Sequence, residues 1–194
     1  KYKRKNIMRD FDLTVIGGGA GGLNVASGAA QLGARVALIE KNKLGGDCLY
    51  YGCVPTKALI HSAKIASLIK RSKEYGLNET NISFDFKNIM NHMREVISKV
   101  GVHDDPKRFE NMGVQVFFGD GRFIDPHTFE FDGKKITSRK FVISTGSRAV
   151  AIPIKGLENI KYLTSESALE LDYLPKSIII LGAGPIGLEF AQVF

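Results

Sequence analysis

Residues 12–30 read DLTVIGGGAGGLNVASGAA. An apolar run leads into a G-x-G-x-x-G turn at Gly17, Gly19 and Gly22, and a stretch of small residues with helical character follows. Gly17 allows the tight turn, Gly19 lets the backbone approach a pyrophosphate, and Gly22 lets helix and strand pack closely. The phosphates would lie at the helix N-terminus, which favours negative charge. These residues predict an α/β fold built on a Rossmann-like dinucleotide-binding unit.

A second buried strand is predicted at residues 34–40, ARVALIE, and it ends in Glu40. An acidic side chain at that strand end can accept hydrogen bonds from ribose hydroxyls. A glycine turn alone would also fit an ordinary flexible loop. The strand before the turn, the helix after it and the acid at the next strand end favour dinucleotide binding.

The same pattern returns at residues 177–189, SIIILGAGPIGLE. It predicts a strand, a second glycine turn and the start of a helix. The sequence ends at Phe194 and begins with Lys1 rather than methionine. We therefore expect a fragment in which a second dinucleotide-binding unit is begun but not completed.

Both cysteines lie in residues 45–57, GGDCLYYGCVPTK, at Cys48 and Cys53. In a regular helix, residues at this spacing have Cα atoms about 8 Å apart, at a rise of about 1.5 Å per residue. A disulfide needs a Cα separation of about 7 Å or less, so bridging requires a bent backbone. Gly52 and Pro55 can supply the bend. A redox-active dithiol is the interpretation that this favours, because a strained bridge is reduced easily.

A stabilised thiolate is expected at the second cysteine. Pro55 suits the first position of a helix, which puts Cys53 near a helix N-terminus with Lys57 one turn later. Two other interpretations are a pair of buried, unpaired cysteines and a structural zinc site. The first is unusual in a loop marked by glycine and proline. The second needs four ligands, and only His61 lies close in sequence, so no metal site is predicted.

The rest of the sequence alternates between helical and strand patterns. Helices are predicted from apolar periodicity at residues 56–72, 86–100 and 108–112. Strands are predicted at residues 114–118 and 141–143, with a hairpin at 128–136 that turns at Asp132-Gly133. We therefore expect a parallel sheet with helices and a β-hairpin layer.

The composition fits a cytoplasmic globular protein. Hydrophobic residues make up 44% of the sequence, and 27 Lys and Arg against 20 Asp and Glu give a net charge of +7. Basic residues crowd the start of the chain, at Lys1, Lys3, Arg4 and Lys5. A nucleic-acid or anionic-membrane tail would have this composition, but no basic or aromatic stripe follows, so a solvated tail or cut linker is favoured and no nucleic-acid partner is expected. No apolar run reaches the roughly 20 residues of a spanning helix.

Taken together, the chain resembles the N-terminal part of the class I pyridine nucleotide-disulfide oxidoreductases, from about Phe11 to Phe194. This family includes dihydrolipoyl dehydrogenase, glutathione reductase and mercuric reductase, and the mercuric-reductase-like members look most similar. The cysteine block is the most specific element, and FFGDGRF at residues 117–123 and KFVISTGSR at 140–148 agree. The resemblance implies a basic tail at residues 1–10, an FAD-binding domain at 11–150, and a linker with the truncated start of an NAD(P)-binding domain at 151–194.

The resemblance also implies residue roles. Cys48 would attack the substrate and Cys53 would lie against the flavin. Lys57 would lie near the reactive nitrogen of the flavin, paired with Glu189. The cofactor-binding residues would be Gly17, Gly19, Gly22, Glu40, Gly46, Asp47, Lys57, Gly121, Thr145 and Gly146 for FAD, and Gly182, Gly184 and Gly187 in the second turn for NAD(P)H.

The implied activity carries electrons from NAD(P)H to FAD, then to the Cys48–Cys53 disulfide, and then to a substrate. That substrate would be a small-molecule or protein-bound disulfide, or mercuric ion, and the parent protein would be a homodimer. The family's catalytic base would lie beyond Phe194, so the fragment would be inactive alone. The alternatives are a flavin-free thiol-disulfide sensor and a redox-silent nucleotide-binding module.

Two positions depart from the family pattern. Asp47 stands where better-known members have threonine, and a carboxylate there would repel phosphate unless it is protonated, bridged by a metal or turned away. Ser144 replaces the usual alanine before Thr145 and Gly146, a change for which we expect little cost.

Overall fold

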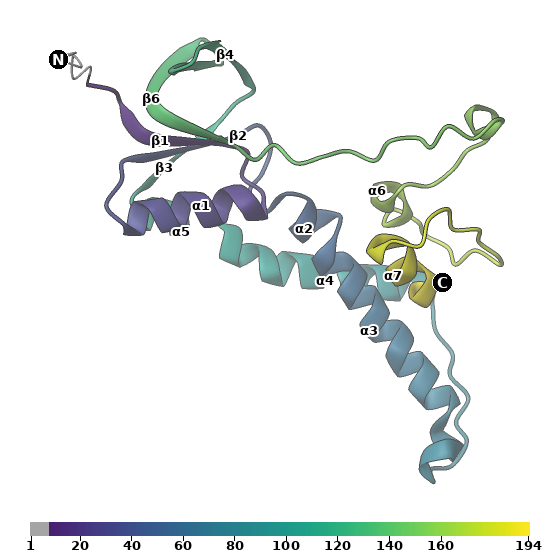
Figure 1. Ribbon diagram of the computed structural model, residues 1–194. Helices are drawn as coiled ribbons and strands as arrows, with labels where there is room; N and C mark the ends of the chain where they lie inside the picture. Colours follow the sequence, from purple (N-terminus) through teal and green to yellow (C-terminus); the bar gives the residue numbers. More distant parts are fainter. Residues whose placement is uncertain (1–7) are drawn as a thin grey trace. The chain divides into compact units, whose positions relative to one another are not determined.

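The computed structural model describes residues 8–194 and divides into two compact units (Figure 1). The first unit comprises the described residues up to Gly46 together with His103–Ser147, and the second comprises Asp47–Val102 together with Arg148–Phe194. Segment 47–102 thus folds with the C-terminal part of the chain rather than with the sheet. The predicted basic cluster at the start of the chain lies outside the described residues.

The first unit is built on one six-stranded sheet with the order β3-β2-β1-β6-β5-β4. Strand pairs β1–β2, β2–β3 and β1–β6 are parallel, whereas β5 pairs antiparallel with both β6 and β4. The α/β, Rossmann-like class predicted from the sequence is confirmed. The strands are β1 Phe11–Ile16, β2 Val36–Glu40, β3 Val114–Phe118, β4 Gly121–Asp125, β5 Thr128–Phe131 and β6 Lys134–Ile143.

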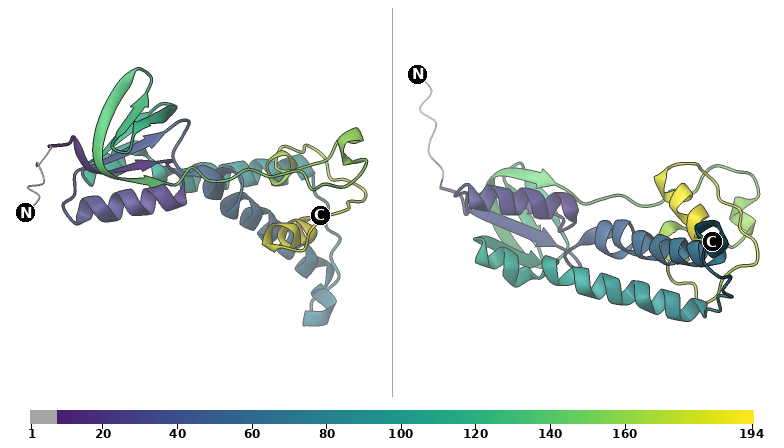
Figure 2. Two further views of the ribbon diagram at one scale, coloured as in Figure 1. Left: turned by 45° about the horizontal axis from the view of Figure 1, so that its top comes forward. Right: turned by 90° about the horizontal axis from the view of Figure 1, so that it is seen from below.

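Two different layers cover the two faces of this sheet. Alternate residues of β2 point to opposite sides, as the pleat requires. Leu38 packs with Leu23 of α1 (Ala20–Gln31) and Phe109 of α5 (Pro106–Asn111), whereas Ile39 packs in a separate cluster with Phe129 of the hairpin. Figure 2 shows α1 lying along the strands and the hairpin rising on the other side. Both faces of β2 are therefore buried, which explains its unbroken apolar run.

The predicted hairpin is present, and its turn has the expected backbone. Asp132 and Gly133 both have positive φ, 45° and 74°, as a type I′ turn requires. Strand β6 is longer than predicted, because it joins the hairpin strand to the strand expected at residues 141–143. Its first half pairs with β5 and its second half with β1. Strand β4 was not predicted from periodicity, and all its residues are exposed.

The second unit is mainly helical. Helix α3 (Cys53–Lys70) packs on α4 (Phe86–Gly101) around Leu59, Met90 and Met93. The helices expected at residues 56–72 and 86–100 are therefore found, with α3 starting three residues earlier. The other helical elements of the chain are α2 Gly46–Tyr50, η1 Ser72–Tyr75, η2 Val102–Asp104, η3 Leu157–Asn159, α6 Ser165–Ala168 and α7 Pro185–Val193. Within the described residues, no helix combines the length and the apolar character needed to cross a membrane.

The strand expected at residues 177–181 does not form. No residue of this run belongs to a strand, and Ile179 is 89% exposed. A parallel strand is stabilised by hydrogen bonds to neighbouring strands. Within residues 8–194, no strand pairs with this run, and only Ile180 of its apolar side chains packs on a core cluster while Ile178, Ile179 and Leu181 are exposed.

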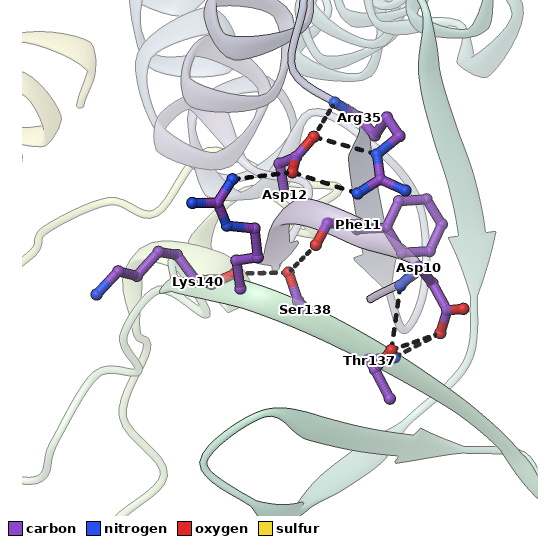
Figure 3. A network of polar contacts seen from close by, with 8 residues as sticks. Asp10, Phe11, Asp12, Arg35, Thr137, Ser138 and Lys140 are labelled. Atoms are coloured by element: carbon purple, nitrogen blue, oxygen red, sulfur yellow. Dashed lines mark hydrogen bonds and ion pairs between the residues drawn. The ribbon is translucent and has the colours of Figure 1, made fainter. Parts of the chain in front are cut away.

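A charged network ties together the strands of the first unit at the start of β1 (Figure 3). Asp12 accepts hydrogen bonds from the backbone N–H of Arg35 at 3.1 Å and from its side-chain Nε at 3.2 Å. Arg139 lies 3.5 Å from the other carboxylate oxygen. Hydrogen bonds from Arg35 lower the pKa of Asp12 from 3.8 to about 2, and Arg139 adds to the effect. The negative charge of Asp12 thus stabilises the folded state.

We expect Asp12→Asn to lower the stability of the folded protein at neutral pH and to reduce the further loss of stability in acid. Because the folded-state pKa is depressed, the contribution of Asp12 is fully present above pH 3.8 and is lost as the pH falls through about 2. The urea midpoint of unfolding should therefore fall more between pH 7 and about pH 2.5 in the wild type than in the variant. Glu110→Gln, at an exposed position of α5, is the control. An equal fall of the urea midpoint in the wild type and in Asp12→Asn would contradict the prediction.

Candidate functional site

The first glycine turn has the geometry of an anion cradle. Gly17 has φ +102°, and a Cβ placed on Gly22 would lie 1.8 Å from the Gly17 carbonyl oxygen. Helix α1 begins after Gly19, and among the described residues no side chain caps its N-terminus. The first N–H groups of a helix have no intrahelical acceptor, so they are available to an anion here. The turn therefore fits the diphosphate of a dinucleotide.

Glu40 lies against this turn. Its Oε2 accepts a hydrogen bond from the Gly18 N–H at 2.6 Å, and its Oε1 accepts one from the Asn42 N–H at 2.8 Å. An ionised carboxylate has about four acceptor positions, so ribose hydroxyls can still donate to it. Gly46 closes the other side, since a Cβ on it would lie 2.7 Å from the Gly19 Cα.

The end of β6 meets the same turn. A Cβ on Gly17 would lie 2.3 Å from the Ser144 carbonyl oxygen and 3.1 Å from the Thr145 Cα. The Ser144 hydroxyl lies 3.0 Å from the carbonyl oxygens of both Ile16 and Gly17 and donates its one proton to this pair of acceptors. Ser144 therefore supports the turn, which the usual alanine could not do. Gly146 follows with φ +72°.

Gly121 has a packing role in the hairpin. A Cβ there would lie 2.2 Å from the Glu130 carbonyl oxygen and 2.7 Å from the Phe129 ring. The absence of a side chain thus lets β4 approach β5. Its assignment to the cofactor stays a prediction.

The two cysteines flank the junction between α2 and α3 in the second unit. Cys48 lies in α2, and Cys53 is the first residue of α3. Between them the chain folds back at Gly52, where a Cβ would lie 3.0 Å from the Asp47 carbonyl oxygen and 3.6 Å from the Cys48 Cα. The bend expected at Gly52 is present. Pro55 is the third residue of α3 rather than the first, and it is tolerated there because N–H groups of a first turn lack intrahelical partners.

Both thiols are free, and they interact with each other. Cys53 is exposed and Cys48 is half-buried. The hydrogen bond with Cys53, reinforced by partial burial, raises the pKa of Cys48. Cys48 thus holds its proton more tightly than an ordinary thiol, and Cys53 beside it is the first residue of α3.

A lysine and a glutamate meet one turn into α3. The Lys57 Nζ lies 3.3 Å from the Glu189 Oε1, and the two residues come from α3 and α7. A hydrogen bond from the Thr56 hydroxyl lowers the pKa of Glu189, and Lys57 lowers it further. Lys57 also acts electrostatically on Cys48, where its charge favours the thiolate. The second unit therefore brings together all four predicted catalytic residues, Cys48, Cys53, Lys57 and Glu189.

Asp47 is paired with a cation. Its Oδ1 lies 3.7 Å from an Arg148 Nη1, and the same guanidinium lies 3.7 Å from Glu166. The carboxylate is thus partly neutralised, which reduces the repulsion of phosphate expected from an acid at this position.

The second glycine turn repeats the backbone of the first. Gly182 has φ +111°, and a Cβ on Gly187 would lie 2.3 Å from the Gly182 carbonyl oxygen. Gly184 precedes α7 with φ −75° and ψ 175°, close to the −79° and −177° of Gly19 before α1. Within the described residues, no group of three or more His, Cys, Asp and Glu side chains could hold a metal ion.

Comparison with known proteins identifies the family. Residues 11–194 match the family described as pyridine nucleotide-disulphide oxidoreductase. The chain belongs to this family. The resemblance inferred from the sequence is therefore confirmed, and the dithiol and both glycine turns all lie within the matched residues.

Several members of the oxidoreductase family are similar over most of this chain. Dihydrolipoyl dehydrogenase of Acholeplasma laidlawii is 35% identical over 193 residues, which are 97% of this chain and 57% of that protein. Mercuric reductase of Bacillus cereus is 32% identical over 185 residues, 95% of this chain and 29% of that protein. The HOCl-induced flavoprotein disulfide reductase RclA from Escherichia coli is 31% identical, with a TM-score of 0.75, over 94% of this chain and 39% of that chain. The chain thus spans less than two thirds of the length of these relatives.

Two residues that contact the site were not predicted from the sequence. Thr56 was counted only as a helix position, and Arg148 only as part of a motif. Arg148 pairs with a residue about a hundred positions away, and no local pattern could reveal that contact. Thr56 carried a weak signal, since a buried hydroxyl in a helix needs a hydrogen-bond acceptor.

Proposed function

We propose that the protein is an FAD-dependent NAD(P)H oxidoreductase that reduces disulfides or soft metal ions through Cys48 and Cys53. The observation that carries the proposal is the thiol pair itself. Two cysteines interact across a bent helix junction, beside Lys57 and Glu189, in a chain of this family. A protein-bound dithiol of this kind exchanges with disulfides.

The residues of the first unit fit an FAD diphosphate. Gly17, Gly19 and Gly22 would provide the open turn, Glu40 would accept from the ribose, and Gly46 leads directly into the dithiol segment. Gly121, Thr145 and Gly146 would complete the contacts in this unit, and the turn at Gly182, Gly184 and Gly187 in the second unit would take the NAD(P)H diphosphate. When bound, FAD would supply the two-electron link between NAD(P)H and the sulfur pair.

The dithiol would carry out the reduction by thiol–disulfide exchange. Cys48 loses its proton and attacks one sulfur of a disulfide R–S–S–R, which breaks that bond and releases one thiol. Cys53 then attacks the Cys48 sulfur, releases the second thiol and forms the Cys48–Cys53 disulfide. Two electrons and two protons leave with the products. The raised pKa of Cys48 means that a base must take its proton first.

The substrate class is proposed from the relatives. A dihydrolipoyl dehydrogenase and a mercuric reductase are both about one-third identical to this chain, and a Cu(II) complex is among the RclA structures similar to it. Small-molecule or protein-bound disulfides and soft metal ions such as mercuric ion are therefore the substrates to test. We further propose a cytoplasmic homodimer, and that residues 1–194 alone do not turn over, since they span 57% or less of these relatives.

Absorbance spectroscopy tests the proposal. The full-length protein that contains residues 1–194 is incubated with FAD, freed of excess cofactor and reduced anaerobically with two electron equivalents of NADH or NADPH. We expect retained flavin absorbance and a new long-wavelength band from a thiolate against the flavin. A colourless protein, or a reduced protein without the band, would refute the proposal in favour of a flavin-free thiol sensor or a redox-silent binding module.

A further inference from the structure

We propose that Ser144 is a positioning residue, which holds the peptide group between Gly17 and Gly18 and, through it, the Glu40 carboxylate. Ser144 directly follows β6, and its hydroxyl lies 3.0 Å from the Gly17 carbonyl oxygen. The N–H of Gly18 belongs to the same peptide group as that carbonyl, and it donates to the Glu40 Oε2 at 2.6 Å. A peptide group is planar and moves as one body. Ser144 and Glu40 are therefore bonded to opposite ends of one rigid unit.

The Ser144 hydroxyl has one proton and two acceptors, and the Gly17 carbonyl depends on it more. The other acceptor, the Ile16 carbonyl oxygen, already accepts from the Ser144 backbone N–H at 2.8 Å. Within residues 8–194, no backbone N–H donates to the Gly17 carbonyl. Leaving a buried acceptor without a donor is costly. The hydroxyl therefore supplies a bond that the backbone does not.

The peptide group at this turn needs such a restraint because it joins two glycines. Residues without a Cβ have the widest choice of backbone conformations. Gly17 already uses this freedom, with φ +102°. A rotation of the peptide group would turn the Gly18 N–H away from Glu40. The carboxylate would then lose the bond to its Oε2 and keep the bond from the Asn42 N–H to its Oε1.

The result is a carboxylate that is oriented before a cofactor binds. Glu40 is the residue to which the proposed function gives the ribose of FAD, and this inference rests on that assignment. A site that is formed in advance binds more tightly, because the ligand does not have to order it. Alanine, the usual residue of the family at position 144, has no hydroxyl and would leave the peptide group to be ordered on binding.

Titration of the flavin-free full-length protein with FAD tests the proposal. Losing one hydrogen bond of this kind changes an equilibrium by about a factor of five, so Ser144→Ala should raise the dissociation constant of FAD about fivefold. Ser138→Ala is the matched control, because Ser138 lies in β6 and its hydroxyl donates to the Lys140 carbonyl at 2.8 Å, not to the turn. An FAD affinity that is unchanged in Ser144→Ala, or equally lowered in Ser138→Ala, would overturn the proposal.

A double-mutant cycle measures whether Ser144 acts through Glu40. In Glu40→Ala the carboxylate is absent, so the further change Ser144→Ala should alter the dissociation constant by less than about twofold. The same fivefold effect with and without the Glu40 side chain would contradict the proposed connection.

Amide hydrogen exchange in the flavin-free full-length protein gives a measurement that needs no cofactor. The Gly18 N–H should exchange about fivefold faster in Ser144→Ala than in the wild type. The Gly17 N–H should be unaffected, since it donates to the Ile39 carbonyl at 2.8 Å and its peptide group keeps the bond from the Ser144 N–H. Equal exchange of the Gly18 N–H in both proteins would refute the positioning role. A wild type that binds no FAD would instead count against the proposed function, so the two can fail separately.

Discussion

Gly22→Ala is expected to lower the free energy of unfolding of the first unit by about 4 kcal/mol or more, which few single substitutions do. The added Cβ would lie 1.8 Å from the Gly17 carbonyl oxygen and 2.7 Å from the Ser144 hydroxyl oxygen. The first of these is a backbone atom, and Gly17 is fixed by its N–H bond to the Ile39 carbonyl at 2.8 Å. Relief would require moving α1 away from the strands, which would open the core around Leu23 and Val15.

A matched substitution in the same helix separates this clash from the general effect of alanine. Gly28 lies six residues further along α1, and a Cβ there would meet nothing within 4 Å. Gly28→Ala should therefore stabilise the protein by roughly 0.5–1 kcal/mol, since glycine is unfavourable inside a helix. Urea unfolding followed by circular dichroism measures both variants. A free energy of unfolding for Gly22→Ala within about 1 kcal/mol of the wild-type value would contradict the expected clash.

The turns were predictable because their geometry is encoded locally. The second glycine turn has nearly the same backbone as the first although no strand forms before it. Glycine spacing therefore sets this conformation without help from a sheet. The Asp132-Gly133 turn and the bend between the cysteines are local in the same sense, and both could be predicted from short stretches of sequence.

Whether residues 177–181 form a strand could not be predicted from the local sequence. Their apolar run has strong strand character, but a strand exists only where another strand lies beside it. Strand β6 gives the opposite case. Its middle lacks an apolar pattern, but pairing with β5 and then β1 keeps it extended over ten residues. In both cases the neighbouring chain, rather than the residues themselves, decides the structure.

The same distinction between local patterns and distant contacts applies to the residues of the candidate site. The cysteines and the glycines can be recognised from their spacing in the sequence. The partners of Lys57 and Asp47 cannot, because Glu189 and Arg148 lie far away in sequence. The Lys57–Glu189 pair was expected only through the family resemblance. Thr56 was missed because its influence on the pKa of Glu189 arises only where α7 packs on α3.

Cys53→Ser is expected to abolish disulfide reduction by the flavin-loaded full-length protein, with a loss of at least about a thousandfold, equivalent to ~4 kcal/mol of barrier. Serine cannot form the sulfur–sulfur bond that completes the exchange. The same substitution should remove the long-wavelength band without releasing FAD, because Cys53 is the thiolate assigned to the flavin side. Cys53 is exposed, and a surface substitution of this size should change stability by no more than about 0.5 kcal/mol. A lost band would therefore report chemistry rather than unfolding.

Cys48→Ser is the partner experiment, and it assigns the two roles. It should abolish turnover equally but keep the band, since the Cys53 thiolate remains. Alkylation by iodoacetamide gives a flavin-free comparison. Cys53 should react faster than Cys48 near neutral pH, because Cys48 is half-buried and hydrogen bonding to Cys53 raises its pKa. A band that survives Cys53→Ser but disappears in Cys48→Ser would exchange the two roles. Full turnover in either variant would show that the sulfur pair is not on the path of the electrons.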